Sequence, residues 1–278
     1  MPLLRRVAII ALLVLVAAYG VRWFLRNTRP HPTIVEPQSS LRAAIGRGPR
    51  ARVARLIHRF APDPQGTGDR LIALSFDDGP YPMYTPMLLD ELKALHVRAT
   101  FFLIGRDADW WPQLARRIAF DGNEIGDHTQ THPNLDAESA LQVRRELIEG
   151  RDTLLRLTGD RSAAALFRPP HGRYTAATLR IAQSLGMKTI FWSDDPGDWR
   201  EMTPAQIEAH VLSHATEPEI LLLHSGKSAT VAALARIVPA FRRAGYRFVT
   251  VGELLSLLGA SAVENPRPIH RTLRAGQE

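Results

Sequence analysis

The sequence predicts an α/β fold in which about seven parallel strands alternate with helices and close into a barrel. Three observations support this prediction. Short apolar runs alternate with amphipathic helical patterns from residue 70 onward, which is typical of a parallel sheet. No glycine-rich nucleotide-binding fingerprint accompanies these units, which favours a barrel over an open doubly wound sheet. Polar residues also follow the strands at their C-terminal ends, where barrel enzymes place their chemistry.

The strands are expected where short apolar runs lie between polar or glycine-containing segments. These runs cover 71–76, 99–104, 124–127, 166–167, 188–192, 220–223 and 247–251. Apolar residues recur at helical spacing between them, over 84–95, 110–120, 137–157, 175–185, 204–214 and 229–243. Strand and helix therefore alternate through a single domain, which we bound at 67–260.

An apolar run over 7–25, interrupted only by Arg22, precedes this domain. Nineteen helical residues reach about 28 Å, which is close to the thickness of a bilayer's hydrocarbon core. We therefore expect residues 1–26 to be an N-terminal transmembrane helix that anchors the chain in the membrane. A small-residue site over 18–20 leaves a cleaved signal peptide as the alternative.

Two further segments flank the domain. Residues 27–66 are rich in Pro, Gly and Arg and are expected to be a basic linker. Within it, 50–60 places its apolar residues on one helical face, which suits either an amphipathic helix on anionic lipid or a short helix docked on the domain. Residues 261–278 form a C-terminal tail.

The net charge of +7 is unevenly distributed along the 278 residues. Residues 1–60 contain eleven Arg and one Glu, a net of +10, which leaves −3 for the remainder. The basic charge thus belongs to the leader region, which favours contact with a membrane and argues against a nucleic-acid-binding domain. The chain has no Cys, so any metal site must use His, Asp or Glu.

His128 and His132 lie four residues apart in a segment that does not read as a helix. Pro133 disfavours a helical conformation for His132, so the pair is expected in a loop or a single turn. By itself such a pair is more typical of a polar surface loop than of a metal site. Its place at the end of the third expected strand, level with polar residues after four other strands, favours a functional site.

Five motifs in order resemble those of the polysaccharide deacetylases of carbohydrate esterase family 4, the NodB-homology domain. They are SFDDGP (75–80), HTQTH (128–132), FRPPHG (167–172), DPGDW (195–199) and LLLH (221–224). Together they span roughly half of the chain. The resemblance implies a deformed (β/α) barrel and a metal-dependent deacetylase.

The resemblance also implies roles for individual residues. Asp78, His128 and His132 match the family's metal ligands, and the expected ion is one divalent metal, zinc in the first place, with cobalt or manganese as alternatives. The other matched positions are Asp77 as general base, His224 as general acid, Arg168 and Asp198 as their partners, and His171, Trp199 and Leu222 as substrate-binding residues. Because successive strand residues point to opposite faces, Asp77 and Asp78 are expected to differ in direction.

Two positions depart from the family pattern. His171 stands where the family usually has Tyr, whose backbone N–H binds the oxyanion, so the change is expected to alter the rim of the cleft and to bring a third imidazole near the metal. Ser75 replaces the more common Thr, and we expect this change to have little effect.

The expected function is therefore the removal of N-acetyl groups from the amino sugars of an envelope or extracellular glycan. The expected partner is an N-acetylated polysaccharide or oligosaccharide. Alternatives are an O-acetyl esterase with the same machinery and a catalytically silent carbohydrate-binding member of the family. A non-haem iron oxygenase also uses two His and one carboxylate, but it has no role for Asp77, Arg168, Asp198 and His224. We expect a monomer at the cell membrane with its catalytic domain outside the cytoplasm, or a secreted protein if the leader is cleaved.

Overall fold

The computed structural model describes residues 70–259. The expected membrane anchor or signal peptide (1–26), the basic linker (27–66) and the C-terminal tail (261–278) lie outside the described residues. Within residues 70–259, no helix combines the length and the apolar character needed to cross a membrane.

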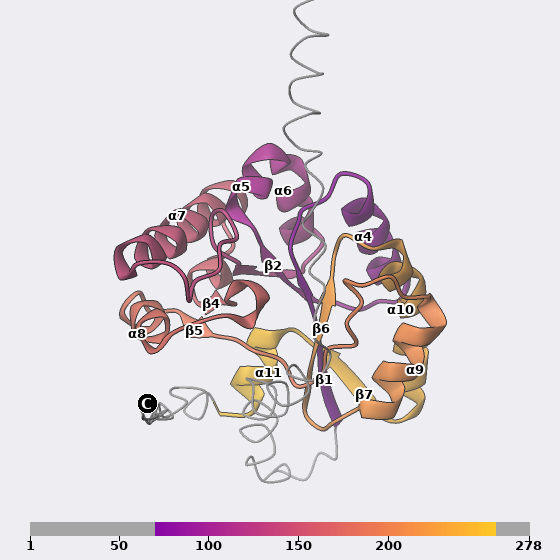
Figure 1. The fold of residues 1–278 in the computed structure, drawn as a ribbon. Helices are drawn as coiled ribbons and strands as arrows, with labels where there is room; N and C mark the ends of the chain where they lie inside the picture. The colour runs from indigo at the N-terminus through magenta and orange to yellow at the C-terminus, as the bar shows by residue number, and fades with distance from the viewer. Residues whose placement is uncertain (1–69, 260–278) are drawn as a thin grey trace, which may run out of the picture. The chain divides into compact units, whose positions relative to one another are not determined.

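Seven parallel strands form the centre of the described domain (Figure 1), as the sequence predicts. They are β1 (Arg70–Asp77), β2 (Thr100–Leu103), β3 (Glu124–Asp127), β4 (Leu166–Phe167), β5 (Lys188–Thr189), β6 (Glu219–His224) and β7 (Tyr246–Val249). The order across the sheet is β5-β4-β3-β2-β1-β6. β7 pairs with the first half of β1, and β2 pairs with its last three residues.

The sheet is closed between β5 and β6 by only a few backbone hydrogen bonds. Ser193 donates its N–H to the carbonyl of Ile220, and Leu222 donates to the carbonyl of Asp194, both at 2.9 Å. Asp194 and Leu221 form an isolated parallel bridge, while the named strands β5 and β6 do not pair. The wall is therefore an incompletely closed, parallel α/β sheet, with a narrow contact where a regular barrel would have a strand pair.

Helices surround this sheet. They are α4 (Tyr84–Ala94), α5 (Gly105–Trp110), α6 (Pro112–Phe120), α7 (Ala140–Thr158), α8 (Ala176–Ser184), α9 (Pro204–His214), α10 (Ser228–Arg243) and α11 (Val251–Leu257), with 3₁₀ turns η1 (Arg161–Ala164) and η2 (Pro170–Gly172). Figure 1 shows α7 and α8 on one side of the strands and α4, α9 and α10 on the other. Six of these helices match expected segments, whereas α5 and α11 were not expected.

Strand alternation separates an outer apolar core from an inner face. Along β1, Ile72, Leu74 and Phe76 pack in the larger core cluster with residues of the surrounding helices, whereas Leu71 and Ala73 belong to a second, inner cluster. Ser75 and Asp77 continue this inner face, because side chains two residues apart share a face of a strand. The polar end of β1 therefore faces the inner side of the sheet, in line with Leu71 and Ala73.

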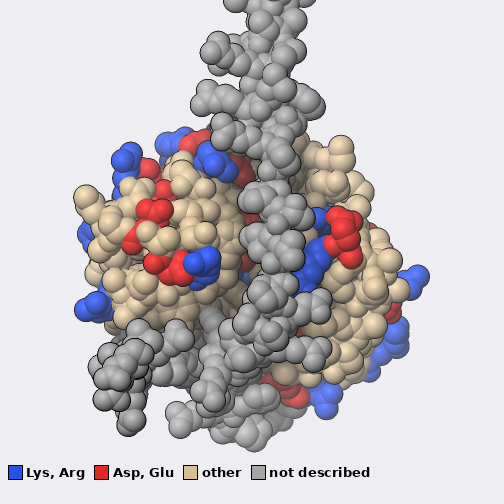
Figure 2. Space-filling view, in the orientation of Figure 1, with Lys and Arg blue, Asp and Glu red and all other residues tan. Residues whose placement is uncertain are grey.

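Several charged side chains on the described surface form pairs of opposite sign. Figure 2 shows Lys and Arg beside Asp and Glu at several places on the visible face. The exposed pairs include Arg145–Glu149, Arg156–Asp109 and Arg173–Asp136. Exposed pairs of this kind contribute little to stability, and most of the energy that positions the site comes from the buried apolar clusters.

Candidate active site and metal centre

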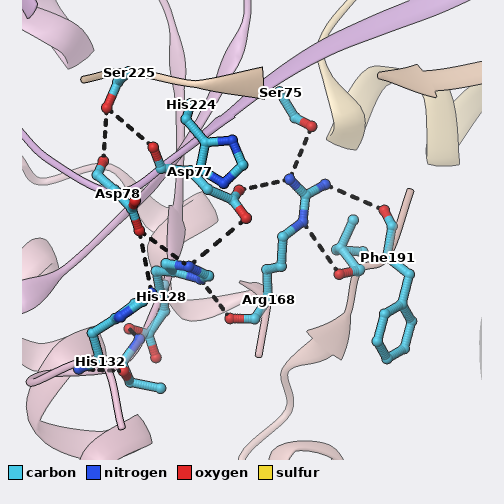
Figure 3. Close-up of polar contacts among 12 residues, drawn as sticks. Ser75, Asp77, Asp78, His128, His132, Arg168, Phe191, His224 and Ser225 are labelled. Atoms are coloured by element: carbon cyan, nitrogen blue, oxygen red, sulfur yellow. Dashed lines mark hydrogen bonds and ion pairs between the residues drawn. The ribbon is translucent and has the colours of Figure 1, made fainter. Parts of the chain in front are cut away.

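A buried ion pair joins β1 to the end of β4. Asp77 is the last residue of β1, and Arg168, which follows β4, is completely buried. The guanidinium of Arg168 donates through Nη1 to Asp77 Oδ1 at 2.7 Å and to Ser75 Oγ at 2.9 Å, and through Nη2 to the carbonyl of Phe191 at 3.2 Å. Its charged plane also lies 4.1 Å above the ring of Phe102. These contacts fix the orientation of the Asp77 carboxylate, as Figure 3 shows.

Asp78, His128 and His132 bring three possible ligand atoms together, all within 4.8 Å of one another. Asp78 Oδ1 lies 3.2 Å from His132 Nε2 and 3.7 Å from His128 Nε2. Two ligands at about 2.0–2.1 Å from a tetrahedral zinc ion are roughly 3.4 Å apart, so the spacing fits such an ion. The structure therefore brings together the three residues that the sequence singled out as ligands.

Strand alternation does not extend from Asp77 to Asp78. The backbone of Asp78 has φ = +68°, a left-handed conformation that ends the extended geometry of β1. As a result, Asp77 Oδ2 and Asp78 Oδ1 both lie 3.7 Å from His128 Nε2, on the same side of the site. The two carboxylates still differ, because Asp77 is bonded to Arg168 and Asp78 to His132.

Burial and hydrogen bonding prepare His128 to act as a ligand. Its Nδ1 lies 2.8 Å from the carbonyl of Arg168, so this nitrogen carries the proton and leaves Nε2 with a free lone pair. Burial lowers the pKa of His128 to about 4, against the opposing charge of Asp77, so the ring is neutral at pH 7. Burial alone would raise the pKa of Asp78, but the hydrogen bond to His132 and the nearby imidazoles hold it below its usual value.

His224 is hydrogen-bonded to Asp198 on the opposite side of the site. The last residue of β6, His224, places Nδ1 2.8 Å from Asp198 Oδ1, and its backbone N–H donates to Asp198 Oδ2. Thr230 Oγ1 donates to the same Oδ2 at 2.6 Å. Burial would lower the pKa of His224, but the bond to Asp198 and the charges of Asp77 and Asp78 raise it to about 9. The imidazole is therefore protonated at neutral pH.

The residues expected to bind substrate are placed differently from one another. His171 lies in η2 with φ = +56°, and its ring centre is 4.6 Å from that of His132. Burial and the neighbouring His132 lower the pKa of His171. Leu222 belongs to the inner apolar cluster, whereas Trp199 is half exposed and carries the guanidinium of Arg200 over its ring at 4.5 Å. The third imidazole thus lies beside His132, one of the three candidate ligands, as expected.

The structure adds residues that sequence reasoning did not identify. Ser225 donates its hydroxyl to the carbonyls of Asp77 and Asp78, both at 3.1 Å, and so ties the end of β1 to the end of β6. Its position directly after His224 was the available signal. Glu146 on α7 accepts two hydrogen bonds from Thr131, within the loop that carries both histidines. No local pattern distinguishes this Glu from the other charged residues of α7.

Comparison with known proteins agrees with this geometry. The polysaccharide deacetylase family model matches residues 65–190. A peptidoglycan-N-acetylglucosamine deacetylase of Bacillus cereus is 39% identical over 192 residues, covering 67% of this chain and 89% of that protein. A chitooligosaccharide deacetylase of Sinorhizobium fredii is 36% identical over 194 residues, covering 65% and 90%.

A solved structure gives the same result for the fold. A mutant of a carbohydrate esterase family 4 pseudoenzyme, with restored enzymatic activity, superposes with a TM-score of 0.65 at 30% identity and covers 68% of each chain. Likeness of fold therefore extends to both active and silent proteins, and the side chains of the site have to distinguish them. On sequence and fold together, this chain belongs to the polysaccharide deacetylase family.

Proposed function

We propose that this chain is a metal-dependent hydrolase that removes N-acetyl groups from amino sugars of an envelope or extracellular polysaccharide. One observation carries the proposal: a carboxylate and a protonated imidazole flank the group formed by Asp78, His128 and His132. Asp77 and His224 are directly paired residues of the neighbouring strands β1 and β6. Amide hydrolysis needs a base for the attacking water and an acid for the departing amine, and this pairing supplies both.

The ligand group fits a divalent ion, zinc in the first place, on its spacing and on the neutral state of His128. When bound, such an ion would polarise the acetyl carbonyl and lower the pKa of the attacking water. Two His and one Asp leave coordination positions open, as a catalytic site requires. Cobalt and manganese accept the same donor types and are the alternatives that elemental analysis would distinguish.

Asp77 is proposed as the general base. Its Oδ1 is hydrogen-bonded to Arg168, and its Oδ2 is directed toward the ligand group, 3.7 Å from His128 Nε2. The hydrogen bond to the buried guanidinium of Arg168 prevents the carboxylate from rotating away. Oδ2 is therefore the atom that would take the proton of the attacking water.

His224 is proposed as the general acid. Asp198 holds the Nδ1 side of the ring, which leaves Nε2 to donate a proton to the leaving nitrogen. The raised pKa, about 9, keeps that proton in place at neutral pH. Asp198 is oriented by Thr230 and by the His224 backbone, so the ring has little rotational freedom.

We further propose that Leu222 and Trp199 contact the acetyl methyl and that the backbone N–H of His171 contacts the carbonyl oxygen. Leu222 precedes His224 by two residues and thus shares its face of β6. The left-handed backbone of His171 and its ring contact with His132 place this residue beside the ligand group. These roles rest on the matched family positions together with that proximity.

Acetate release is the test of the proposed function. The full-length protein is stripped with a chelator and assayed on peptidoglycan, chitooligosaccharide, poly-N-acetylglucosamine and acetylated xylan, with and without added zinc. We expect zinc-dependent release from at least one N-acetylated glycan. Release from acetylated xylan alone would identify an O-acetyl esterase, and no release from any substrate by zinc-loaded protein would identify a silent member.

We also propose that the catalytic domain works outside the cytoplasmic membrane. The support is the apolar segment over 7–25 together with the extracytoplasmic location of such glycans. Protease treatment of intact spheroplasts should then digest the domain. Protection of the domain in intact spheroplasts, with digestion only after lysis, would contradict this location.

A further inference from the structure

The loop that carries both histidines has a backbone that needs external support. Between His128 and His132, Thr129 has φ = +72° and His132 has φ = +64°. Non-glycine residues are strained in this region and adopt it only where the surroundings hold them. The relative position of the two imidazoles therefore depends on whatever fixes this loop.

Every backbone N–H from Thr129 to His132 has a partner. Thr129 donates to Asp127 Oδ1, and His132 donates to Thr129 Oγ1, so the acceptors of these two bonds lie within residues 127–132. Gln130 donates to the carbonyl of Glu146, and Thr131 donates to the Glu146 carboxylate at 2.8 Å. Among these described bonds, the side-chain acceptor that lies outside residues 127–132 is Glu146, on α7.

The Glu146 carboxylate receives Thr131 with both of its oxygens. Oε2 accepts from the Thr131 N–H, and Oε1 accepts from Thr131 Oγ1, each at 2.8 Å. Glu146 is 3% exposed, and Gln142 Nε2 lies 3.3 Å from Oε1 and holds it from the same helix. A two-point attachment to a nearly buried side chain fixes both the position and the rotation of Thr131, which directly precedes His132.

Gly150 sets the distance between α7 and the loop. It lies one helical turn after Glu146, and a Cβ there would come within 2.4 Å of Asp127 Oδ1 and 2.8 Å of the Thr129 carbonyl carbon. The helix backbone is thus in direct contact with the start of the loop, at the distance where the Glu146 carboxylate reaches Thr131. One face of α7 thus packs directly against residues 127–131 and supports them.

We propose that Glu146 is a positioning residue for the metal site, acting through Thr131 to hold His132 at its distance from His128 and Asp78. This inference rests on the ligand set of the proposed function. Glu146 touches neither His132 nor His128 through a described contact, and its effect is transmitted by the loop backbone. Residues that orient metal ligands in this way typically change metal affinity by about 10- to 100-fold when removed.

The test is zinc affinity of the full-length apoprotein, measured by competition with a chromophoric chelator, together with thermal unfolding of the apoprotein. Glu146→Ala should weaken zinc binding by about 10- to 100-fold. Glu146→Gln should restore it to within about threefold, because the carboxamide accepts from the Thr131 N–H and donates to its hydroxyl. A carboxylate that acted through its charge would instead make Gln as weak as Ala, and that result would overturn the proposal.

Two further variants separate positioning from general stability. Glu149→Ala removes an exposed carboxylate of the same helix that pairs with Arg145, and it should leave zinc affinity unchanged. Thr131→Val keeps the N–H but loses the hydroxyl, and it should weaken zinc binding roughly fivefold even if Glu146→Ala does not fold. Adding Thr131→Val to Glu146→Ala should cause little further loss, since both remove one interaction.

Unchanged zinc affinity in folded Glu146→Ala and in Thr131→Val, with a lower unfolding temperature, would show a purely structural role and refute the proposal. Wild-type protein that binds no zinc would refute both this inference and the proposed mechanism. Wild-type protein that binds zinc through Asp78 and His132 but releases no acetate would refute only the proposed function, because zinc affinity is measured without substrate.

Discussion

Arg168 joins the chemistry of the site to the stability of the fold. Its guanidinium is completely buried and bonds to a carboxylate, a hydroxyl and backbone carbonyls that belong to β1 and to the segment after β5. A buried cation of this kind is tolerated because its partners compensate for lost hydration. Removing the negative charge of Asp77 should therefore affect both catalysis and folding.

Asp77→Asn should retain zinc, lose activity by about 10²- to 10⁴-fold and lower the free energy of unfolding by about 3 kcal/mol. The activity falls because the base is lost, and the stability falls because Arg168 keeps its buried charge without a counter-charge. Elemental analysis, acetate release and urea unfolding measure the three effects.

Asp78→Asn is the matched comparison, because it is adjacent in sequence and 3.2 Å from His132. It should weaken zinc binding, with activity partly recovered at high zinc concentration. Zinc lost in Asp77→Asn but retained in Asp78→Asn would show that the two roles are exchanged.

Asp198→Asn should move the alkaline limb of the pH profile of kcat/KM to lower pH. The bond and charge of Asp198 raise the pKa of His224, so the neutral amide lowers that pKa and the imidazolium is lost earlier as pH rises. The amide oxygen still accepts the hydrogen bonds of Thr230 and of the His224 backbone. An unchanged alkaline limb would show that a group other than His224 causes the fall in activity at high pH.

Among the strands and helices, the sequence pattern predicted the elements whose formation depends mainly on the spacing of their own apolar residues. The seven strands and six of the helices follow from apolar spacing. The expected start of α7 at 137 was three residues early, because the helix begins at Ala140 after Ser139, whose side chain accepts from the Gln142 N–H. α5 and α11 were missed because they have only six and seven residues and present little helical periodicity.

The residues of the candidate site also fall into those that sequence motifs predicted and those that they did not. The three candidate ligands, Asp77 and His224 were singled out from sequence motifs, and the structure brings them together. The left-handed backbone of Asp78 could not be predicted, because a φ of +68° lies outside the strand geometry on which the alternation of side chains depends. Glu146 was missed because its partner Thr131 lies fifteen residues away and meets it only after α7 has packed.

Gly150→Ala should destabilise the protein, although alanine is normally about 0.5–1 kcal/mol better than glycine inside a helix. The added methyl has no room against Asp127 and Thr129, so α7 has to shift away from the loop. We expect a lower unfolding temperature and weaker zinc binding together. Glu149→Ala, on the exposed side of the same helix, serves as the control and should change neither. A stabilised Gly150→Ala protein with normal zinc binding would contradict the close packing.

At the scale of the whole molecule, the contact between β6 and the segment after β5 contains buried acids. Glu219, at the start of β6, is fully buried and accepts the N–H of Thr216. Asp194, in the bridge to β6, is bonded to His210 of α9. Burial raises the pKa of Glu219 to about 8, and the charge of Asp194 adds to the effect. Protonation of Glu219 is therefore linked to folding.

The stability that Glu219 contributes should be present below about pH 4.5 and lost as pH rises to about 8, because the folded state binds the proton more tightly than the unfolded state. Glu219→Gln should remove this dependence. The difference in unfolding free energy between the two proteins should change by at most about 1.4 kcal/mol per pH unit over that window. Denaturant titrations at pH 5, 6, 7 and 8 measure it, and parallel curves for the two proteins would contradict the linkage.

The few hydrogen bonds that close the sheet between β5 and β6 also indicate how readily this part of the molecule opens. A sheet margin held by a few backbone bonds opens at lower free energy than a paired strand. The amides of Ser193 and Leu222, which make that closure, should therefore exchange with deuterium well before those in the middle of β1. The chain that continues from Ser193 carries Asp198 and Trp199, so this side of the candidate site would move on the timescale of the opening, while the loop from His128 to His132 stayed fixed.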